Sequence, residues 1–373
     1  MNYLTISKTH ILNALQSIIS VVEKRNSLPI LLNVLIEKTN DKVVFTTSDI
    51  ELQISSSVRL QSTENLSKLT VSARKLLDIV KLLNDGQINF SLRDNKLFIN
   101  QDRSKYSLHT LPSEDFPLVS VNEDTKTILK ISSVSLKSVF DSVSFSMAIQ
   151  DVRYFLNGLY LELTPTSLVA VTTDGHRLSY NAVRTEVETI IDASFEGKFS
   201  CIIPRKAITE IQKLLSDKDE LVEIDFYKNH LQINTDKHTF ISRLIEGNYP
   251  DYSRVIPDES KIDILIKRVD ILSKLQRVQI LTSDKYRGIK IQLEKEKIIL
   301  KVVNSEQEEA QEEIICENED QLDIGFNVIY LIDVLANMKT EDICISLIDS
   351  QSSAVIKIPN NDDYKYIVMP MRI

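Results

Sequence analysis

One order of sequence features occurs three times along the chain, at a spacing of about 125 to 132 residues. Each copy begins with an amphipathic segment, continues with two apolar segments around a short polar turn, and ends with a second amphipathic segment and more apolar segments. This period is longer than that of solenoid repeats, so each copy is expected to be a domain. We predict three similar domains, at residues 1–125, 126–257 and 258–373.

A helix is predicted at the start of each copy. Apolar residues recur there every three to four positions, which is the spacing of one helical face. These residues are Ile11, Leu12, Leu15, Ile18, Ile19 and Val22 in the first copy, Val134, Val139, Phe140 and Val143 in the second, and Ile271, Leu272, Leu275 and Val278 in the third.

An antiparallel hairpin is predicted after each of these helices, because two apolar segments flank a polar turn. A second helix follows in each copy, and Ser72 and Asn327 are predicted to cap two of these helices. The fold class is therefore predicted to be α+β, with two helices packed on antiparallel sheets in each domain. Tandem duplication of this kind can also serve only to enlarge a scaffold.

The charge of the chain is unevenly distributed. The net charge of -9 argues against a protein whose whole surface binds nucleic acid. Lys and Arg nevertheless outnumber Asp and Glu on the predicted helices, so we expect a basic helix layer and an acidic sheet layer. The main contributors are Lys8, Lys24, Arg74, Lys75, Lys81, Lys137, Arg205, Lys206, Lys213, Lys274 and Arg277.

No cofactor or metal is expected, and the cytoplasm is the expected location. The chain has no apolar run of membrane-spanning length and no basic leader with a cleavage site. Cys201, Cys316 and Cys344 are too far apart for a paired zinc site or a disulfide framework, and are interpreted as buried, reduced thiols. The chain has only seven glycines, so a glycine-rich phosphate-binding loop is not expected.

Several longer motifs resemble a known family. They include Leu28–Leu31, Thr110–Pro117, Phe145–Ala148, Gln150–Gly158, Thr173–Leu178, Pro250–Tyr252, Glu306–Ala310, Ile324–Asn327 and Val368–Ile373. In these motifs the chain closely resembles the beta subunits of bacterial DNA polymerase III, the beta sliding clamps, from Tyr3 to Ile373. The resemblance implies a head-to-tail homodimer, in which six domains form a ring with helices around the hole and sheets outside.

The function implied by the resemblance is that of a non-enzymatic processivity factor, which encircles duplex DNA and tethers other proteins to it. Expected partners are duplex DNA without sequence preference, the DNA polymerase III alpha subunit, the clamp-loader complex, other clamp-binding polymerases and repair proteins, and a second copy of the chain. Membranes are not among them. A basic lining that contacts phosphates without reading bases would let the ring slide.

Three sets of residues are assigned by this resemblance. The residues expected to face DNA are Arg25, Arg74, Gln150, Tyr154, Phe155, Arg205 and Lys206. The residues expected to form a pocket for partner peptides are Leu156, Thr173, Gly175, His176, Arg177, Leu178, Pro250, Arg254, Val255, Ser353, Val368, Met369, Pro370, Met371 and Arg372. The residues expected at the dimer interface are Lys75, Tyr106, Leu108, Ile280, Leu281, Glu306, Glu308 and Glu309.

Other interpretations stay open on the residues alone. Asp174 and His176 could serve as an acid–base pair or as metal ligands in a metal-dependent hydrolase, although the corresponding turns, Ser48–Ile50 and Ser305–Gln307, contain no histidine. A scaffold that binds proteins but not DNA is a further alternative. Phe155 could pack against a neighbouring strand, and the terminal Met-Pro-Met could dock as an edge strand.

Overall fold

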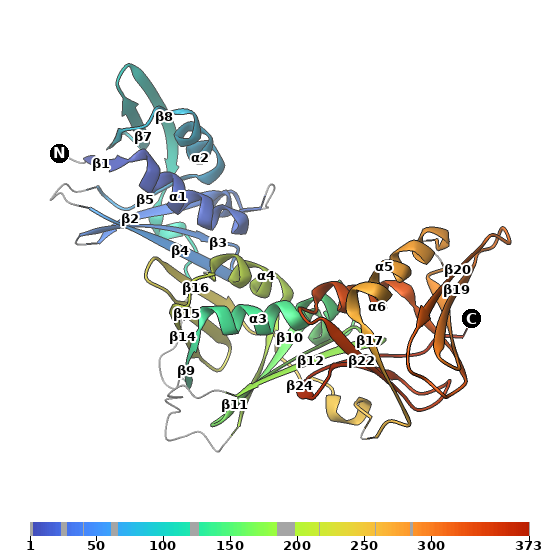
Figure 1. Cartoon of the computed structure of the whole chain (residues 1–373). Helices are drawn as coiled ribbons and strands as arrows, with labels where there is room; N and C mark the ends of the chain where they lie inside the picture. The colour runs from blue at the N-terminus through green and yellow to red at the C-terminus, as the bar shows by residue number, and fades with distance from the viewer. Residues whose placement is uncertain are drawn as a thin grey trace. The chain divides into compact units, whose positions relative to one another are not determined.

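Figure 1 shows the computed structural model of the chain. It describes residues 3–23, 28–39, 41–60, 66–119, 127–184, 198–215, 217–257, 259–283 and 286–372. No helix in these residues is long and apolar enough to cross a membrane.

In its described residues, the first repeat contains eight strands, two α-helices and three short 3-10 turns. In chain order they are β1 (Tyr3–Ser7), α1 (Lys8–Ile18), η1 (Ile19–Val21), η2 (Pro29–Leu32), β2 (Asn33–Thr39), β3 (Lys42–Ser48), β4 (Leu52–Arg59), β5 (Leu69–Ser72), α2 (Ala73–Leu82), β6 (Gln87–Arg93), β7 (Lys96–Gln101), β8 (Ser104–Leu111) and η3 (Ser113–Asp115).

The second repeat has the same order of strands and α-helices. Its elements are β9 (Thr127–Ser132), α3 (Ser133–Val143), η4 (Ser144–Ser146), η5 (Tyr154–Asn157), β10 (Gly158–Thr164), β11 (Ser167–Thr173), β12 (Arg177–Arg184), β13 (Phe199–Pro204), α4 (Arg205–Leu214), β14 (Leu221–Phe226), β15 (His230–Asn234), β16 (His238–Arg243) and η6 (Tyr252–Val255).

The third repeat follows the same pattern. Its elements are β17 (Ile262–Lys267), α5 (Arg268–Val278), η7 (Gln279–Leu281), β18 (Gly288–Glu294), β19 (Lys297–Val303), β20 (Glu309–Ile315), β21 (Leu322–Asn327), α6 (Val328–Asn337), β22 (Asp342–Leu347), β23 (Ala354–Ile358) and β24 (Asn361–Val368). The three repeats inferred from the sequence are therefore also repeats of structure.

Each repeat supplies two sets of four antiparallel strands. In the first repeat, one set has the order β5-β2-β3-β4 and the other the order β1-β6-β7-β8, and the later repeats use the same orders. Between repeats, β4 pairs with β16 and β12 pairs with β24, which creates one sheet of twelve strands and one of eight. We call the β4–β16 pairing the first junction and the β12–β24 pairing the second junction.

The chain forms two compact units. The first contains the 12-stranded sheet, and the second contains the 8-stranded sheet and the 4-stranded sheet β20-β19-β18-β21. Helices α3 and α4 include residues of both units.

The helices cover the sheets with the faces predicted from the apolar spacing. In α1, Ile11, Leu15 and Ile18 are buried, and α1 packs against α2 as α5 packs against α6 (Figure 1). Val134 is an exception, since its side chain is 43% exposed. It lies in the first turn of α3, before the helix reaches the buried positions Val139 and Phe140.

Only one of the two predicted helix caps forms. The side-chain oxygen of Asn327 accepts a hydrogen bond from the backbone N–H of Ile329 at 3.0 Å, as predicted. Ser72 precedes α2, but its hydroxyl makes no capping bond, so that prediction was wrong. Ser72 is the last residue of β5, as Asn327 is the last residue of β21, so the two positions share the strand-to-helix step and differ in the side chain.

The helices of the described residues are basic, as the sequence predicted. Together the six contain eleven Lys and Arg and five Asp and Glu, although the chain has a net charge of -9. The excess lies in α1, α2, α4 and α5, because α3 contains one Lys and one Asp and α6 contains no Lys or Arg. All three cysteines are free thiols, with Cys316 and Cys344 buried and Cys201 half-buried.

Candidate functional site

The site is built around the turn between β11 and β12, residues Thr173–His176. The carboxylate of Asp174 accepts the backbone N–H groups of His176 and Arg177 at 2.9 and 3.1 Å. The hydroxyl of Thr173 donates to the carbonyl of Arg177 at 2.5 Å and accepts the N–H of Gly175 at 3.0 Å. These side chains satisfy the backbone groups of a tight turn, as Asp and Thr commonly do.

Two features of this turn favour glycine at position 175. The φ of Gly175 is +90°, a region that residues with a Cβ rarely adopt. A Cβ at this position would also lie 2.9 Å from two guanidinium nitrogens of Arg153. The guanidinium therefore occupies the space that the missing side chain leaves free.

The Arg153 guanidinium is fixed against this turn. It donates to the carbonyl of Asp174 at 3.1 Å and to both carboxylate oxygens of Asp151 at 3.0 and 2.9 Å. The side-chain hydrogen bond from Arg153 lowers the pKa of Asp151 to about 2. Asp151 thus stays ionised and holds Arg153 in place at neutral pH.

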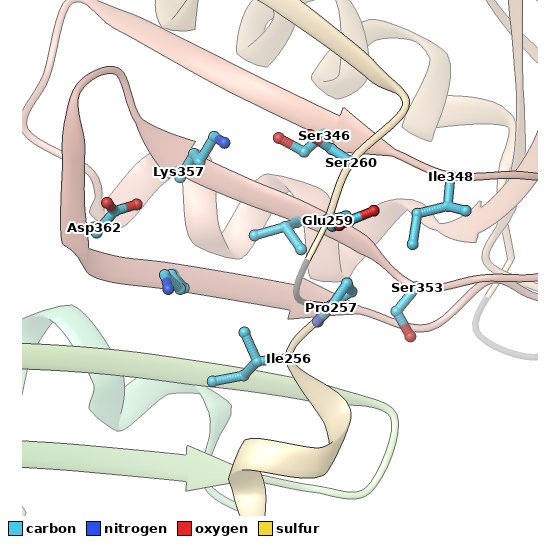
Figure 2. Close-up of a pocket in the computed structure, with 11 residues that line it drawn as sticks. Ile256, Pro257, Glu259, Ser260, Ser346, Ile348, Ser353, Lys357 and Asp362 are labelled. Carbon is cyan, nitrogen blue, oxygen red and sulfur yellow. The ribbon is translucent and has the colours of Figure 1, made fainter.

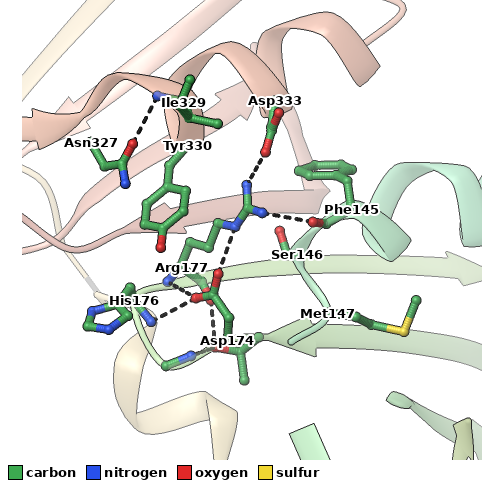
Figure 3. Close-up of polar contacts among 12 residues, drawn as sticks. Phe145, Ser146, Met147, Asp174, His176, Arg177, Asn327, Ile329, Tyr330 and Asp333 are labelled. Carbon is green, nitrogen blue, oxygen red and sulfur yellow. Dashed lines mark hydrogen bonds and ion pairs between the residues drawn. The ribbon is translucent and has the colours of Figure 1, made fainter. Parts of the chain in front are cut away.

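Arg177 links the turn to helix α6 (Figure 3). Its guanidinium donates to Asp174 at 3.0 Å, to Asp333 of α6 at 2.5 Å and to the carbonyl of Phe145 at 2.9 Å. It also lies 4.4 Å from the ring centre of Tyr330, which is a cation–π distance. The side chain is only 10% exposed, so its charge interacts with other groups of the protein and hardly with solvent.

The surroundings of Arg177 stabilise its charged form. Burial alone would lower the pKa of the guanidinium. The interaction with Tyr366 and the hydrogen bond to Asp333 outweigh burial and raise the pKa above its ordinary value. Arg177 is a permanent cation that connects β12 to α6.

A cavity of about 220 Å³ opens beside the turn. Its walls are mostly apolar and come from the β11–β12 turn, the segment that precedes β10, the η6 segment and β24 with its tail. The lining residues are Arg153, Leu156, Thr173, Gly175, Arg177, Leu178, Tyr249, Pro250, Asp251, Tyr252, Val255, Ile367 and Met369. A cavity of this size and character can hold one or two apolar side chains of an extended peptide.

Stacked tyrosines stiffen one wall of the cavity. The rings of Tyr160 and Tyr249 are stacked with centres 4.9 Å apart, and Tyr252 lies 5.9 Å from Tyr160. Burial raises the pKa of the Tyr249 hydroxyl, which is buried without a hydrogen-bond partner among the described residues. This wall is rigid because its rings constrain one another.

Eight of the residues assigned to the pocket from the sequence line this cavity. They are Leu156, Thr173, Gly175, Arg177, Leu178, Pro250, Val255 and Met369. The cavity is also lined by residues that were not predicted from the sequence, Arg153, Tyr249, Asp251, Tyr252 and Ile367. The signal that could have found Arg153 is Gly175, since the corresponding turns contain Ile50 and Gln307, and a glycine in their place indicates that another group approaches closely.

The remaining assigned residues lie around the cavity or apart from it. Ser353 lines a separate cavity of about 110 Å³ together with Ile256 and Pro257 (Figure 2). Val368 is fully buried in β24, paired with Arg177.

The tail after β24 is held by backbone hydrogen bonds. The N–H of Met369 donates to the carbonyl of His176, and that of Met371 donates to the carbonyl of Gly325, both at 2.9 Å. Pro370 between them is half-buried, and Arg372 is exposed. Arg254 is exposed and pairs with Asp251 at 2.9 Å.

The geometry of Asp174 and His176 does not form an acid–base pair. Both carboxylate oxygens of Asp174 are occupied by the turn and by Arg177, and the exposed imidazole of His176 points away from them (Figure 3). Among the described residues, no three His, Cys, Asp or Glu side chains lie close enough together to hold a metal ion.

The residues assigned to DNA lie on the helices and on the loop before β10. Arg25 lies outside the described residues. Arg74 is the second residue of α2 and donates to the carbonyl of Val22 at 2.6 Å, while Arg205 begins α4 and donates to the carbonyl of Met147 at 2.9 Å. Burial lowers the pKa of Arg205 below its ordinary value. Lys206, next on α4, is exposed.

The loop before β10 exposes apolar side chains. Gln150 is exposed at φ +55°, and Tyr154 is 58% exposed with its ring edge-on to that of Phe155 at 5.8 Å. Ile149 and Val152 are 72% and 95% exposed in the same loop. These two residues were missed from the sequence, because a short apolar segment does not by itself indicate exposure.

The residues assigned to the dimer interface lie at two ends of the repeat series. Tyr106 and Leu108 are on β8, and Lys75 is exposed on α2. In the third repeat, Ile280, Leu281, Glu306 and Glu308 line a cavity of about 510 Å³ between η7 and the β19–β20 turn. Glu309 begins β20.

Comparisons with known proteins agree along the whole chain. Family models match at residues 1–120, 130–251 and 253–372, as the N-terminal, central and C-terminal domains of the DNA polymerase III beta subunit.

Curated relatives match over their full length. The chain is 39% identical to the beta sliding clamp of Pseudomonas putida and 38% identical to that of Pseudomonas aeruginosa, in each case over 373 residues and 100% of both chains.

Solved structures give the same result. A crystal structure of the DNA polymerase sliding clamp from Pseudomonas aeruginosa with ligand matches with a TM-score of 0.95 and 38% identity, covering 100% of both chains. Another from that organism, bound to griselimycin, matches with a TM-score of 0.93 and covers 100% of this chain and 99% of that one. The chain therefore belongs to the family of DNA polymerase III beta subunits, the beta sliding clamps.

Proposed function

We propose that this protein is a DNA sliding clamp, which encircles duplex DNA and tethers the replicative polymerase and other replication and repair proteins to it. The family is one of processivity factors and not of enzymes. The observation that carries the proposal is the pairing rule between repeats. The edge strand of one strand set pairs with the edge strand of the next repeat at both junctions. The same rule leaves β20 and the Ser104–His109 part of β8 as the two unused edges, since β5 pairs with β8 only at Thr110 and Leu111.

The chemistry of β8 supports a partner strand from a second copy. Tyr106 pairs with Ile99 in the same register in which Phe240 pairs with Ile233 and Tyr366 with Ile356. Phe240 and Tyr366 are 1% and 0% exposed at their junctions, whereas Tyr106 is 39% exposed. Tyr106 is thus the one member of this equivalent set, among the described residues, that lacks a neighbouring strand to cover it.

Pairing of β20 with β8 of a second copy would produce a head-to-tail homodimer. Each copy would then use both of its open edges, and six domains would form a closed ring. Ile280 and Leu281 border the cavity beside β20 and offer Tyr106 an apolar surface. The three domains of each copy would be residues 1–125, 126–257 and 258–373.

The basic helices suit a ring that holds DNA without reading its sequence. Contacts from Arg74, Arg205 and Lys206 to phosphates would exchange easily, so closure of the ring rather than tight binding would retain the duplex. The exposed apolar loop with Tyr154 could contact bases at a single-stranded edge. The cytoplasm, where bacterial replication takes place, is the proposed location.

The cavity beside Gly175 is proposed to bind short peptide segments of the polymerase III alpha subunit, the clamp loader and other clamp-binding proteins. Apolar walls with the Arg153 guanidinium beside them suit a peptide with apolar anchors and an acidic or carbonyl group next to them. The side chain of Met369 can adapt to anchors of different shape. Arg177 would contribute its aliphatic part and its positioning of the turn.

Retention on circular DNA tests the proposed function. The protein is loaded onto nicked circular DNA by an excess of a bacterial clamp loader, and the complex is passed through a gel-filtration column before and after the DNA is linearised. A clamp stays with the circle and leaves the linear molecule at its ends. Equal retention on both DNAs indicates ordinary binding, and no retention on either supports the protein-only scaffold.

Leu281→Asp tests the proposed interface in the same assay. A charge in the apolar surface should abolish the dimer at nanomolar concentration in sedimentation and abolish retention on the circle. Leu265→Asp is the matched control, because Leu265 is 60% exposed on β17, a strand outside this surface. A Leu281→Asp protein that is still dimeric would place the interface elsewhere.

A further inference from the structure

A second large recess lies in the first compact unit, beside the first junction. It has a volume of about 620 Å³ and lies between α1, the outer ends of β3 and β4, and the β15–β16 turn. The lining residues are His10, Asn13, Ala14, Ser17, Lys42, Ser56, Ser57, Val58, Arg59, Asp236, Lys237 and His238. We call this recess the α1 groove.

The α1 groove has an excess of positive charge. Lys42, Arg59 and Lys237 line it, and within the described part of the chain none of the three forms an ion pair. One carboxylate, that of Asp236, is also part of the lining. Unneutralised cations grouped around one recess form a field that attracts anions.

Polar side chains complete the lining. The groove includes Asn13, Ser17 and Ser57, and the imidazole of His238 lies 3.0 Å from the Ser17 hydroxyl. The Ser17 hydroxyl donates to the carbonyl of Ala14 at 2.8 Å, and that of Ser57 donates to the carbonyl of Lys237 at 3.5 Å. The apolar members of the groove, Ala14 and Val58, are only 4% and 8% exposed. The groove therefore offers charge and polar groups, but little apolar surface for the anchors on which peptide binding depends.

The second junction provides an internal comparison. His238 pairs with Ser56 across the first junction, and Tyr364 pairs with Asn181 across the second, in the same register. His238 contacts Ser17 of α1, and Tyr364 contacts Ser142 at the equivalent place of α3.

Two differences separate these equivalent places. Tyr364 is only 6% exposed and fills the space between helix and sheet, whereas the smaller ring of His238 borders an open groove. The charge differs as well. By the same register, Lys42 and Lys237 correspond to Ser167 and Asp363 at the second junction, and Arg59 corresponds to Arg184.

We propose that the α1 groove is a binding site for the phosphodiester backbone of nucleic acid, contacted by Lys42, Arg59 and Lys237 with Asn13 as a further donor. This site is distinct from the residues assigned to DNA above and from the peptide cavity. Binding there is independent of sequence, because the groove contains no aromatic ring other than imidazole on which a base could stack. The backbone can come from a single strand or from a duplex.

The test measures binding of fluorescein-labelled oligothymidylate and of a short hairpin duplex to the full-length protein by fluorescence anisotropy. The variant Lys42→Ala, Arg59→Ala, Lys237→Ala should bind at least one of the two probes roughly tenfold more weakly at low salt. The dependence of log affinity on log salt should become shallower by roughly 0.7 per lost contact for the single strand, or roughly 0.9 for the duplex. The probe that responds identifies the source of the backbone.

Two further variants separate the groove from net charge. Arg184→Ala removes one cation at the equivalent position of the second junction, so it should leave affinity and salt slope unchanged, whereas Arg59→Ala alone should lower both. His238→Tyr keeps every Lys and Arg but introduces the side chain that fills the second junction, and it should weaken binding without a change in net charge. Melting temperature and dimerisation confirm that each variant is folded.

The outcomes that overturn the proposal are distinct. Unchanged affinity of the triple variant for both probes, or an equal loss in Arg184→Ala and Arg59→Ala, removes the site. Weaker binding of labelled polyglutamate with unchanged binding of both nucleic acids would assign the groove to an acidic peptide instead. None of these results depends on retention of circular DNA. The proposed clamp function can therefore be refuted while the proposed groove is supported, and the groove can be refuted while the clamp function is supported.

Discussion

The two junctions of this chain have the same backbone arrangement and different chemistry. At each, an Asp carboxylate caps the turn that precedes the junction strand. Asp49 accepts the N–H groups of Glu51 and Leu52 at 3.1 and 2.7 Å, just as Asp174 accepts those of His176 and Arg177. The first junction has a charged groove near its helix, while the second has an apolar cavity near its turn.

The difference arises from a few exchanged side chains. The residue after the Asp is Ile50 in one turn and Gly175 in the other, and both have positive φ, 81° and 90°. Two residues further on, Leu52 is buried where Arg177 forms its ion pairs. The turn and the strand register therefore belong to the repeat, whereas binding properties depend on substitutions that leave the backbone unchanged.

Arg177→Leu, which copies Leu52 into the second turn, should have the largest effect. It leaves the carboxylates of Asp174 and Asp333 without their shared cation, and loss of one partner of a largely buried pair costs about 3 kcal/mol. The free energy of unfolding of the second unit should fall by that amount in urea denaturation followed by tyrosine fluorescence, since the chain has no Trp.

Asp333→Asn is the control for Arg177→Leu. Asp333 is 34% exposed, so water can replace part of its interaction, and the loss should be about 1 kcal/mol. If Arg177→Leu costs no more than Asp333→Asn, the guanidinium is not the centre of the network.

Gly175→Ile, which places the residue of the first turn in the second, should mainly lower the affinity for partner peptides. The new Cβ would collide with the guanidinium of Arg153 and displace it from the rim of the cavity. Affinity for a labelled C-terminal peptide of the polymerase alpha subunit should fall about tenfold, equivalent to about 1.4 kcal/mol. The reciprocal variant Ile50→Gly should leave peptide affinity unchanged. Equal affinities of the two variants would show that the position of Arg153 is irrelevant to peptide binding.

The smallest predicted effect is a decrease in the stability of the folded chain at low pH. Burial and the neighbouring charge of Lys237 lower the pKa of His238 below its ordinary 6.5. The unfolded chain therefore takes up a proton before the folded chain does, and stability decreases as the pH falls through 6.5. The urea midpoint should fall between about pH 7.5 and about pH 5, and by less in His238→Tyr, which copies Tyr364. Identical decreases in both proteins would assign the effect to other groups.

The apolar faces could be predicted from the sequence because they depend on local spacing. Ile11, Leu15 and Ile18 are buried for a reason that is visible within a few helical turns. Strand pairing between repeats could not be predicted in this way. The contact of His238 with Ser17 joins residues 221 positions apart, and no local pattern indicates which edges meet.

The candidate site was predictable to a similar degree. Leu156, Pro250 and Met369, which line the cavity, were assigned to it through resemblance. The role of Arg177 was not, because a guanidinium on a strand can point to solvent or inward, and the choice depends on Asp333, 156 residues away. The α1 groove was invisible in the sequence for the same reason, since Lys42, Arg59 and Lys237 come from separate segments.

The two open edges have a further consequence for the life of the chain before it finds a partner. Along Ser104–His109, β8 has a neighbouring strand on one side only, and six of its eight residues are exposed. Edge strands of this kind can add strands of any other chain and start aggregates. At β20, Glu309, Glu312 and Glu313 lie along the edge, and each pairs with a cation of the same chain, Lys301, Arg277 and Lys297 respectively. The proposed dimer would therefore protect the chain from indiscriminate aggregation by covering both edges.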